Sequence, residues 1–238
     1  MSPSKAGPAL AVFDVDGTLV DSRKVIHDAA LAAFAEMDLP PPPYDAVRQI
    51  VGLNLDLGLS MIAPGLSAAG LAELEVRYKE AFHRFHLEPG FTEPLYEGAA
   101  DMLEQMRADG WRLSIATGKS RRGVEMIVAM HRWQDLFETT HCADDGPGKP
   151  HPAMVLEAMK GQGVTPERTI MIGDTSHDMR MAKAAGVRAQ GVAWGFHTLQ
   201  EVLDGGADHV AEDFQTLNDQ LHRFATATAQ ADKPLDRP

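Results

Sequence analysis

The chain has 238 residues, of which 44% are hydrophobic and 24% charged, and this composition suits one large domain or a core domain that carries a smaller insert. Its net charge of -12 argues against nucleic acid or an anionic membrane as a partner, because both attract clustered Lys and Arg. The single cysteine excludes an intramolecular disulfide, and no stretch approaches the roughly 18 apolar residues of a membrane span. We therefore expect a cytoplasmic protein.

Short apolar runs alternate with longer helical patterns along most of the chain. The runs predict five strands, at residues 10–13, 112–117, 139–143, 169–173 and 187–194. Runs of this length without strict polar alternation are typical of strands buried on both faces, and hence of a parallel sheet. The repeated strand–helix units predict a doubly wound α/β fold, in which ligands bind at the carboxyl ends of the strands.

The region after the first strand breaks this alternation, because it shows helical patterns and no strand. Two apolar stripes at helical spacing define it: Ile26, Ala30, Ala33, Phe34 and Met37, then Leu71, Leu74, Tyr78, Phe82 and Phe85. We predict a helical cap domain over residues 21–92, inserted into a core of residues 1–20 and 93–225, with a disordered tail over 226–238. The cap either closes over the end of the first strand as a lid or is a static elaboration, and the pattern fits both.

Four polar features follow four of the predicted strands. They are Asp14 and Asp16 in DVDGT, Thr117 and Gly118 in ATGKS, Lys149 in GKP, and Asp174 with Asp178 in GDTSHD. Taken singly, each has an ordinary structural explanation: a turn, a helix N-cap at Thr117, a solvated loop lysine, and acidic residues at a helix start. Because ligands of parallel sheets bind at the carboxyl ends of the strands, we expect all four features to lie together there.

The residue types at this edge fit phosphoryl-transfer chemistry. Asp14 and Asp174 offer hard anionic oxygens of the kind that Mg²⁺ prefers, and Asp178 lies one helical turn later, facing the same ion or its waters. Lys149 supplies a point charge for a phosphate oxygen and offsets the carboxylates. A carboxylate can attack phosphorus to give an aspartyl-phosphate, and a second one, Asp16, can act as general acid and then as general base.

These motifs, in this order, resemble those of the haloacid dehalogenase superfamily of phosphatases, and the helical insert resembles that family's α-helical class 1 cap. The resemblance implies a Rossmann-like parallel sheet with strand order 3-2-1-4-5. It implies that Asp14 is the nucleophile and a metal ligand, and that Asp16 is the general acid/base and a ligand through its backbone carbonyl. Asp174 is the further metal ligand that it implies, with Asp178 near the ion. The residues that it places at the phosphate are Asp14, Val15, Asp16, Thr117, Gly118 and Lys149, and the cofactor is Mg²⁺.

Departures from the motifs of neighbouring families narrow the expected reaction. Asp16 argues against the dehalogenases and the phosphonate-cleaving members, because both lack this second aspartate. The phosphonate-cleaving members also use a lysine of the cap, so without that reaction we expect Lys24 to be a surface lysine. Sugar-phosphate mutases carry a cap arginine shortly after a glycine, where this chain has Asn54 and Leu55, so a β-phosphoglucomutase-like phosphomutase is less favoured. Least favoured is a non-catalytic phospho-acceptor such as a response-regulator receiver, which needs only half this length.

The segment GVAWGFHTLQEVLDGGADHVAEDFQTL, residues 191–217, resembles the C-terminal part of phosphoglycolate phosphatase-like members. It makes 2-phosphoglycolate the first-choice substrate, while a sugar phosphate, a nucleotide and pyrophosphate stay open. We expect a small phosphorylated substrate and a monomer or homodimer.

Other side chains near the motifs are candidates for substrate selection. Arg48, Asn54 and Asp56 flank Gly52 in a cap loop that would face the leaving group. The pair Arg121 and Arg122 would add positive field near the phosphate, or simply begin a solvated helix. His151, in KPHP, would either meet the substrate or be an incidental loop histidine.

Overall fold

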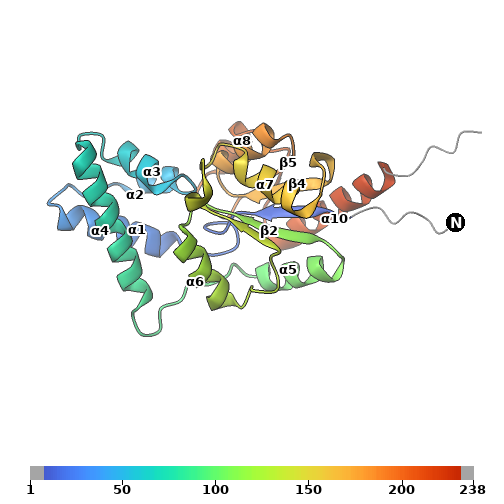
Figure 1. The fold of residues 1–238 in the computed structure, drawn as a ribbon, viewed down its shortest axis with the longest axis horizontal. Coiled ribbons are helices and arrows are strands. Elements are labelled where there is room, and N and C mark those ends of the chain that lie inside the picture. Colours follow the sequence, from blue (N-terminus) through green and yellow to red (C-terminus); the bar gives the residue numbers. More distant parts are fainter. Residues whose placement is uncertain (1–7, 232–238) are drawn as a thin grey trace, which may run out of the picture.

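The computed structural model describes residues 8–231, with a six-stranded parallel sheet at its centre (Figure 1). The strands are β1 (Leu10–Phe13), β2 (Arg112–Ala116), β3 (Thr139–His141), β4 (Thr169–Gly173), β5 (Arg188–Val192) and β6 (His209–Ala211). Their order is β3-β2-β1-β4-β5-β6. The predicted order 3-2-1-4-5 is therefore present, and β6 extends it at one edge. The sequence did not predict β6 because three residues make too short an apolar run.

Both faces of the sheet are covered by helices, as a buried parallel sheet requires. On one face, Ala11 and Phe13 of β1 join a buried cluster with residues of three helices: α5 (Ala99–Ala108), α6 (Arg121–His131) and α10 (Phe214–Ala231). On the other face, Leu10 and Val12 join a cluster with residues of α7 (Ala153–Gln162), α8 (Ser176–Ala185) and α9 (Leu199–Asp204). Successive residues of β1 thus point to opposite layers, and Figure 1 shows α5 and α6 on the side of the sheet away from α7 and α8.

The C-terminal helix corrects one prediction. Helix α10 continues to Ala231, so the prediction of a disordered tail from residue 226 is wrong for residues 226–231. The remainder of that predicted tail, 232–238, and residues 1–7 of the predicted core lie outside the described residues.

The insert between β1 and α5 is helical, as predicted, and forms a lobe beyond the carboxyl ends of the strands (Figure 1). Its helices are α1 (Arg23–Glu36), α2 (Tyr44–Ile50), α3 (Leu55–Ile62) and α4 (Ala68–His86). The two apolar stripes meet in its interior, where Ala33 and Phe34 of α1 share a buried cluster with Leu74 of α4. In the described part of the chain no helix is both long and apolar enough to cross a membrane.

The two connections between this cap and the core run side by side. Val20 forms an antiparallel bridge with Leu95, and the Asp21 N–H donates to the Pro94 carbonyl at 2.8 Å. Val20 also bridges Asp16. The place where the two connections pair therefore lies next to the aspartates that follow β1.

Candidate active site

The chain makes a tight turn directly after β1, and Gly17 of this turn lies against Asp174. The Leu19 and Val20 N–H groups both donate to the Val15 carbonyl at 3.0 Å, which folds the chain back sharply. Gly17 has a φ of +79°, and a Cβ there would lie 2.3 Å from Asp174 Oδ2. Only glycine combines this backbone conformation with so close an approach. The glycine after DVD is therefore required by the carboxylate packed against it.

One group of charges, which we call the carboxylate-rich cluster, consists of Asp14, Lys149, Asp174 and Asp178. Lys149 Nζ lies 2.8 Å from Asp14 Oδ1 and 2.7 Å from Asp178 Oδ1. Each of the three aspartates has a carboxylate oxygen within 4.8 Å of those of the other two. All four residues are at most 1% exposed. Lys149 thus contacts two of the three buried carboxylates, and Asp174 lies beside them.

Local structure holds Asp174 and Asp178 in place. The Thr18 hydroxyl and the Phe196 N–H donate to Asp174, at 2.8 and 2.7 Å. The Thr175 N–H donates to Asp178 Oδ2 at 3.1 Å and the Asp178 N–H donates to the Thr175 hydroxyl at 3.2 Å, which makes a capping box at the start of α8. The Thr175 hydroxyl also donates to Asp178 Oδ2 at 2.6 Å. Helix capping therefore accounts for one oxygen of Asp178, but the other contacts Lys149.

The electrostatics of the carboxylate-rich cluster call for a further cation. Burial raises the pKa of Asp14 to about 7, against the opposing charge of Lys149. Burial, with Asp14 and Asp178 nearby, also raises the pKa of Asp174 well above its usual range. Asp14 Oδ2 is buried and has no hydrogen-bond partner among the described residues. Hard carboxylate oxygens with an unmet charge fit a divalent cation such as Mg²⁺. Asp16 contributes no side-chain oxygen to this group.

A second group of charges, which we call the balanced cluster, consists of Asp16, Lys119, Glu93 and His86. Lys119 Nζ lies 2.8 Å from Asp16 Oδ1 and 3.4 Å from Glu93 Oε1. His86 Nε2 lies 2.9 Å from Glu93 Oε2, and His86 Nδ1 lies 2.8 Å from the Phe82 carbonyl. Both partners of His86 are oxygen acceptors, so a ring nitrogen that carries a hydrogen can donate to either of them. Lys119 thus contacts both carboxylates, and the His86 ring contacts one of them.

The balanced cluster connects the core with the cap. Asp16 and Lys119 belong to loops after β1 and β2, Glu93 lies in the connection that returns from the cap, and His86 is the last residue of α4. Burial alone would raise the pKa of Glu93, but Lys119 and His86 outweigh it and hold that pKa below its usual value. The side chain of Asp16 is therefore held through a chain of ion pairs that ends on a cap helix.

Sequence reasoning missed Lys119, Glu93 and His86. Lys119 carried a signal, since it stands two residues after Thr117 at the same strand end. Glu93 and His86 carried none, because only the path of the returning connection brings them to Lys119.

The loop after β2 brings Thr117 and Gly118 to the same edge. The Thr117 N–H donates to the His141 carbonyl at 3.0 Å, and its hydroxyl accepts from the Lys119 N–H at 3.2 Å. Helix α6 is capped instead by Ser120, whose hydroxyl accepts from the Gly123 N–H, so Thr117 is not the N-cap. A Cβ on Gly118 would lie 2.7 Å from the Gly52 carbonyl oxygen. The cap loop therefore lies directly on this core loop.

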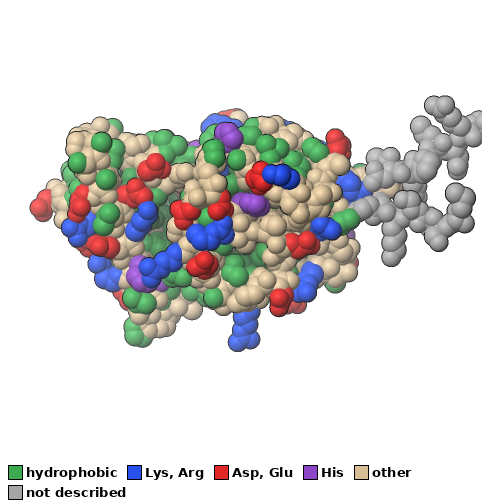
Figure 2. All heavy atoms as spheres, in the orientation of Figure 1, with side chains coloured by type: hydrophobic (Ala, Val, Ile, Leu, Met, Phe, Trp, Pro, Cys, Tyr) green, Lys and Arg blue, Asp and Glu red, His purple; other side chains and the backbone are tan. Residues whose placement is uncertain are grey.

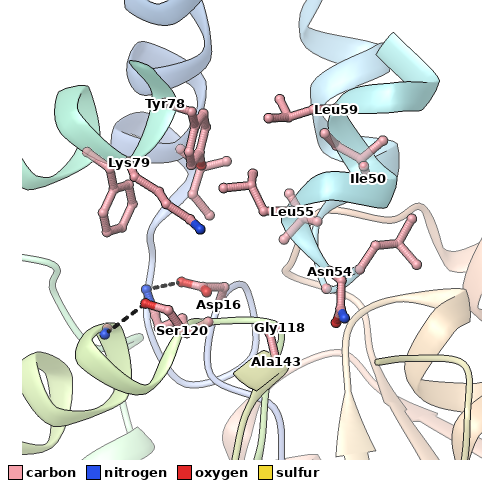
Figure 3. A pocket seen from close by; sticks show the side chains of 18 of the residues that line it. Asp16, Ile50, Asn54, Leu55, Leu59, Tyr78, Lys79, Gly118, Ser120 and Ala143 are labelled. Atoms are coloured by element: carbon pink, nitrogen blue, oxygen red, sulfur yellow. Dashed lines mark hydrogen bonds and ion pairs between the residues drawn. The ribbon is translucent and has the colours of Figure 1, made fainter. Parts of the chain in front are cut away.

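A cavity of about 490 Å³ lies between cap and core. Asp14, Asp16, Thr117 and Gly118 line it from the core, and the helices of the cap line it from the opposite side (Figure 3). Val15 and Lys149 do not line it; Lys149 lies close to it through its contact with Asp14. The face drawn in Figure 2 is hollowed between the cap and the core, and acidic and basic side chains are interspersed there.

The predicted cap residues separate into two groups. Asn54 lines the cavity, and its buried Oδ1, beside Gly148, has no hydrogen-bond partner in the part of the chain that the structure describes. Asp56 also lines the cavity. Arg48 does not; it pairs with Asp45 at 2.9 Å and with Glu201 of α9 at 2.8 Å, tying the cap to the core. The geometry thus favours Asn54, and not Arg48, for contact with a leaving group.

The remaining candidates also separate by position. Arg122 lines the cavity and lies 2.8 Å from His83 Nε2, whereas Arg121 is engaged by Asp145 and is outside it. His151 is exposed, and its Nδ1 accepts from the N–H of Ala153. Lys24 is an exposed lysine paired with Asp28, as the sequence predicted.

Comparisons with known proteins agree with this arrangement. A family model described as "Haloacid dehalogenase-like hydrolase" matches residues 11–192. The "Probable phosphatase IndB" of Dickeya dadantii is 30% identical over 214 residues, covering 90% of this chain and 93% of the relative. A "Phosphoglycolate phosphatase" of Psychrobacter arcticus is 28% identical over 218 residues, covering 89% and 95%. A solved haloacid dehalogenase-like hydrolase of Streptococcus pneumoniae superposes with a TM-score of 0.77 at 25% identity, covering 90% and 98%.

Proposed function

The chain belongs to the haloacid dehalogenase-like hydrolases, and we propose that it is a Mg²⁺-dependent phosphomonoesterase that forms an aspartyl-phosphate on Asp14. The observation that carries this proposal is the division of the DVD aspartates between two clusters. Asp14 contacts Lys149 among an excess of carboxylates, and Asp16 contacts Lys119 in a balanced set of charges. Two carboxylates in different environments can take different chemical roles, here nucleophile and general acid/base.

The chemistry follows from these positions. A carboxylate oxygen of Asp14 forms a bond to phosphorus while the bond from phosphorus to the leaving oxygen breaks. Asp16, in its protonated form, donates a proton to that leaving oxygen and becomes the carboxylate that later acts as base. In the second step a water attacks the phosphorus, Asp16 takes the proton of the water, and the bond to Asp14 breaks to release inorganic phosphate.

Other residues at the cavity floor or directly behind it bind the transferring group. Thr117 offers its hydroxyl, Val15, Asp16 and Gly118 offer backbone N–H groups, and Lys149 offers a positive charge. Asp14, Asp174 and the Asp16 carbonyl would hold Mg²⁺, with Asp178 close by. When bound, the ion would offset the negative charge that carboxylates and phosphate bring together.

The substrate is a small phosphorylated metabolite, and 2-phosphoglycolate is the reference compound because several relatives carry that name. We also place the enzyme in the cytoplasm, as a monomer or homodimer. These statements are proposals drawn from the sequence and from the names of relatives.

The test is release of inorganic phosphate by the purified protein, with and without Mg²⁺, from 2-phosphoglycolate, a sugar phosphate, a nucleotide and pyrophosphate. We expect turnover that requires Mg²⁺ and that is lost in Asp14→Asn and in Asp16→Asn. Full activity in either variant would contradict its role. A mutase would isomerise a sugar phosphate without releasing phosphate, and a phospho-acceptor would take up phosphate once without turnover.

A further inference from the structure

We propose that the leaving group of the substrate is a bulky apolar alcohol, such as a longer alkyl or an arylalkyl group, rather than glycolate. This inference rests on the phosphatase function proposed above and narrows the substrate class of the same site. Two observations support it: large apolar side chains form opposed walls of the cavity, and the buried cations near the cavity are already paired with carboxylates.

Two opposed walls of the cavity beyond Asp16 carry large apolar side chains, and Asp56, Glu75 and Lys79 of the same helices line it as well. Ile50, Leu55 and Leu59, from α2 and α3, form one wall, and Tyr78 of α4 faces them across the cavity (Figure 3). The Tyr78 ring stacks on Phe82, one helical turn later on the same wall, with ring centroids 6.1 Å apart and an interplanar angle of 18°. Because Asp16 protonates the leaving oxygen in the proposed reaction, the organic group extends from Asp16 into the space between these walls.

The cations that line the cavity offer little to a second anionic group. Lys119 is held between Asp16 and Glu93, and Lys79 pairs with Glu75. Lys149, behind the floor, is held between two aspartates. Among the described residues that line the cavity, this leaves two exposed cations: Lys79, whose pair with Glu75 is a weak surface pair on one helix, and Arg122, beside His83. A glycolate carboxylate would thus meet no buried and uncommitted cation, and burying that charge without a partner would be costly.

The size of the cavity points the same way. A volume of about 490 Å³ falls in the range of pockets that bury drug-sized ligands, roughly 300–1,000 Å³. Glycolate would leave the apolar walls in contact with water, but a larger apolar group would remove both its own surface and theirs from water. Burial of each methylene should then raise kcat/KM by about fourfold, the factor that corresponds to about 0.8 kcal/mol.

The experiment measures kcat/KM with Mg²⁺ for ethyl, butyl, hexyl and 2-phenylethyl phosphate and for 2-phosphoglycolate. The primary alkyl esters have similar leaving groups, so their differences report on burial of the chain. We expect a steady rise from ethyl to hexyl, a high value for the 2-phenylethyl ester, and a lower value for 2-phosphoglycolate. A flat or falling series, or a preference for 2-phosphoglycolate that Arg122→Ala abolishes, would overturn the inference while leaving the phosphatase function intact.

Two variants of Leu55 and a matched control variant test whether this wall of the cavity causes the preference for long alkyl esters. Leu55→Asn makes the wall polar and Leu55→Trp fills the space, and each should lower the ratio of hexyl to ethyl activity. Leu57, on the same helix, is 47% exposed and outside the cavity, so Leu57→Asn should leave that ratio unchanged. An unchanged ratio in both Leu55 variants would overturn the assignment of this wall. Absence of phosphate release from every ester would instead overturn the proposed function itself.

Discussion

The two buried charge clusters of this protein are neighbours, yet they differ in charge balance. The carboxylate-rich cluster sets three aspartates against Lys149, and Asp14 Oδ2 has no hydrogen-bond partner among the described residues. In the balanced cluster Lys119 lies between Asp16 and Glu93, and Glu93 also contacts the His86 ring. Both lie almost wholly out of water, where an uncompensated charge is costly.

The difference in charge balance indicates which cluster is suited to bind a further cation. In the balanced cluster both carboxylates already contact Lys119, so its role is to hold Asp16 in place and to tie that side chain to the cap. A set with excess negative charge is stabilised by a further cation or by a bound proton. The carboxylate-rich cluster is accordingly where we propose Mg²⁺ binding and phosphate chemistry, and the following changes test that distinction.

The largest effect is expected from Asp14→Asn. Turnover should fall to background, since the nucleophile is lost, while the metal-free protein should become more stable because one uncompensated buried charge is removed. Phosphate release and thermal unfolding without Mg²⁺ measure the two effects on the same sample. A variant that loses both activity and stability would show that Asp14 is needed for folding, against the proposed role.

Much of the carboxylate-rich cluster is predictable from the sequence, whereas most of the balanced cluster is not. Asp14, Lys149 and Asp174 each follow a recognisable strand, and parallel topology alone brings strand ends together. Glu93 and His86 lie in a connection and at the end of a cap helix, so their meeting depends on how the cap is seated on the core. No local pattern encodes that seating.

The same reason explains the placement of Arg48. Its position near Gly52 suggested the cavity, but α2 turns its side chain toward Glu201 on α9. Likewise β6 is too short for a periodic signal, and its pairing with β5 is what makes it a strand. The direction of the Arg48 side chain and the formation of β6 both depend on contacts between secondary-structure elements, and not on the sequence pattern within one element.

The second effect comes from breaking the balanced cluster at its centre. Lys119→Met leaves Asp16 and Glu93 buried without their shared cation and should lower the free energy of unfolding by about 3–5 kcal/mol. It should also lower kcat more than it raises KM, because Asp16 loses its position for proton transfer. Lys119→Arg keeps the charge and should restore part of both quantities. Chemical denaturation and steady-state kinetics make the comparison, and an Arg variant no better than Met would rule out a role for the charge.

The third effect is a dependence of stability on pH in the metal-free protein. The pKa of Asp14 is raised from 3.8 to about 7, so between these values the folded state binds more protons than the unfolded state. The free energy of unfolding should therefore fall as the pH rises from about 4 to about 7, by at most about 4 kcal/mol. Mg²⁺ or Asp14→Asn should flatten this dependence. A slope that neither change alters would have to arise outside the carboxylate-rich cluster.

The smallest effect is expected from Glu93→Gln, which unbalances the balanced cluster without emptying it. The amide keeps the size of the side chain but leaves Lys119 with Asp16 alone and gives His86 a neutral partner, so the free energy of unfolding should fall by about 1–2 kcal/mol. Glu88→Gln is the matched control, because Glu88 is exposed in the same connection and should change stability by less than about 0.5 kcal/mol. The effect of Glu93→Gln should shrink in a Lys119→Met background, since the pair that it weakens is already gone. If the two changes simply add, Glu93 and Lys119 act independently, and the link from Asp16 to the cap is not a single chain of charges.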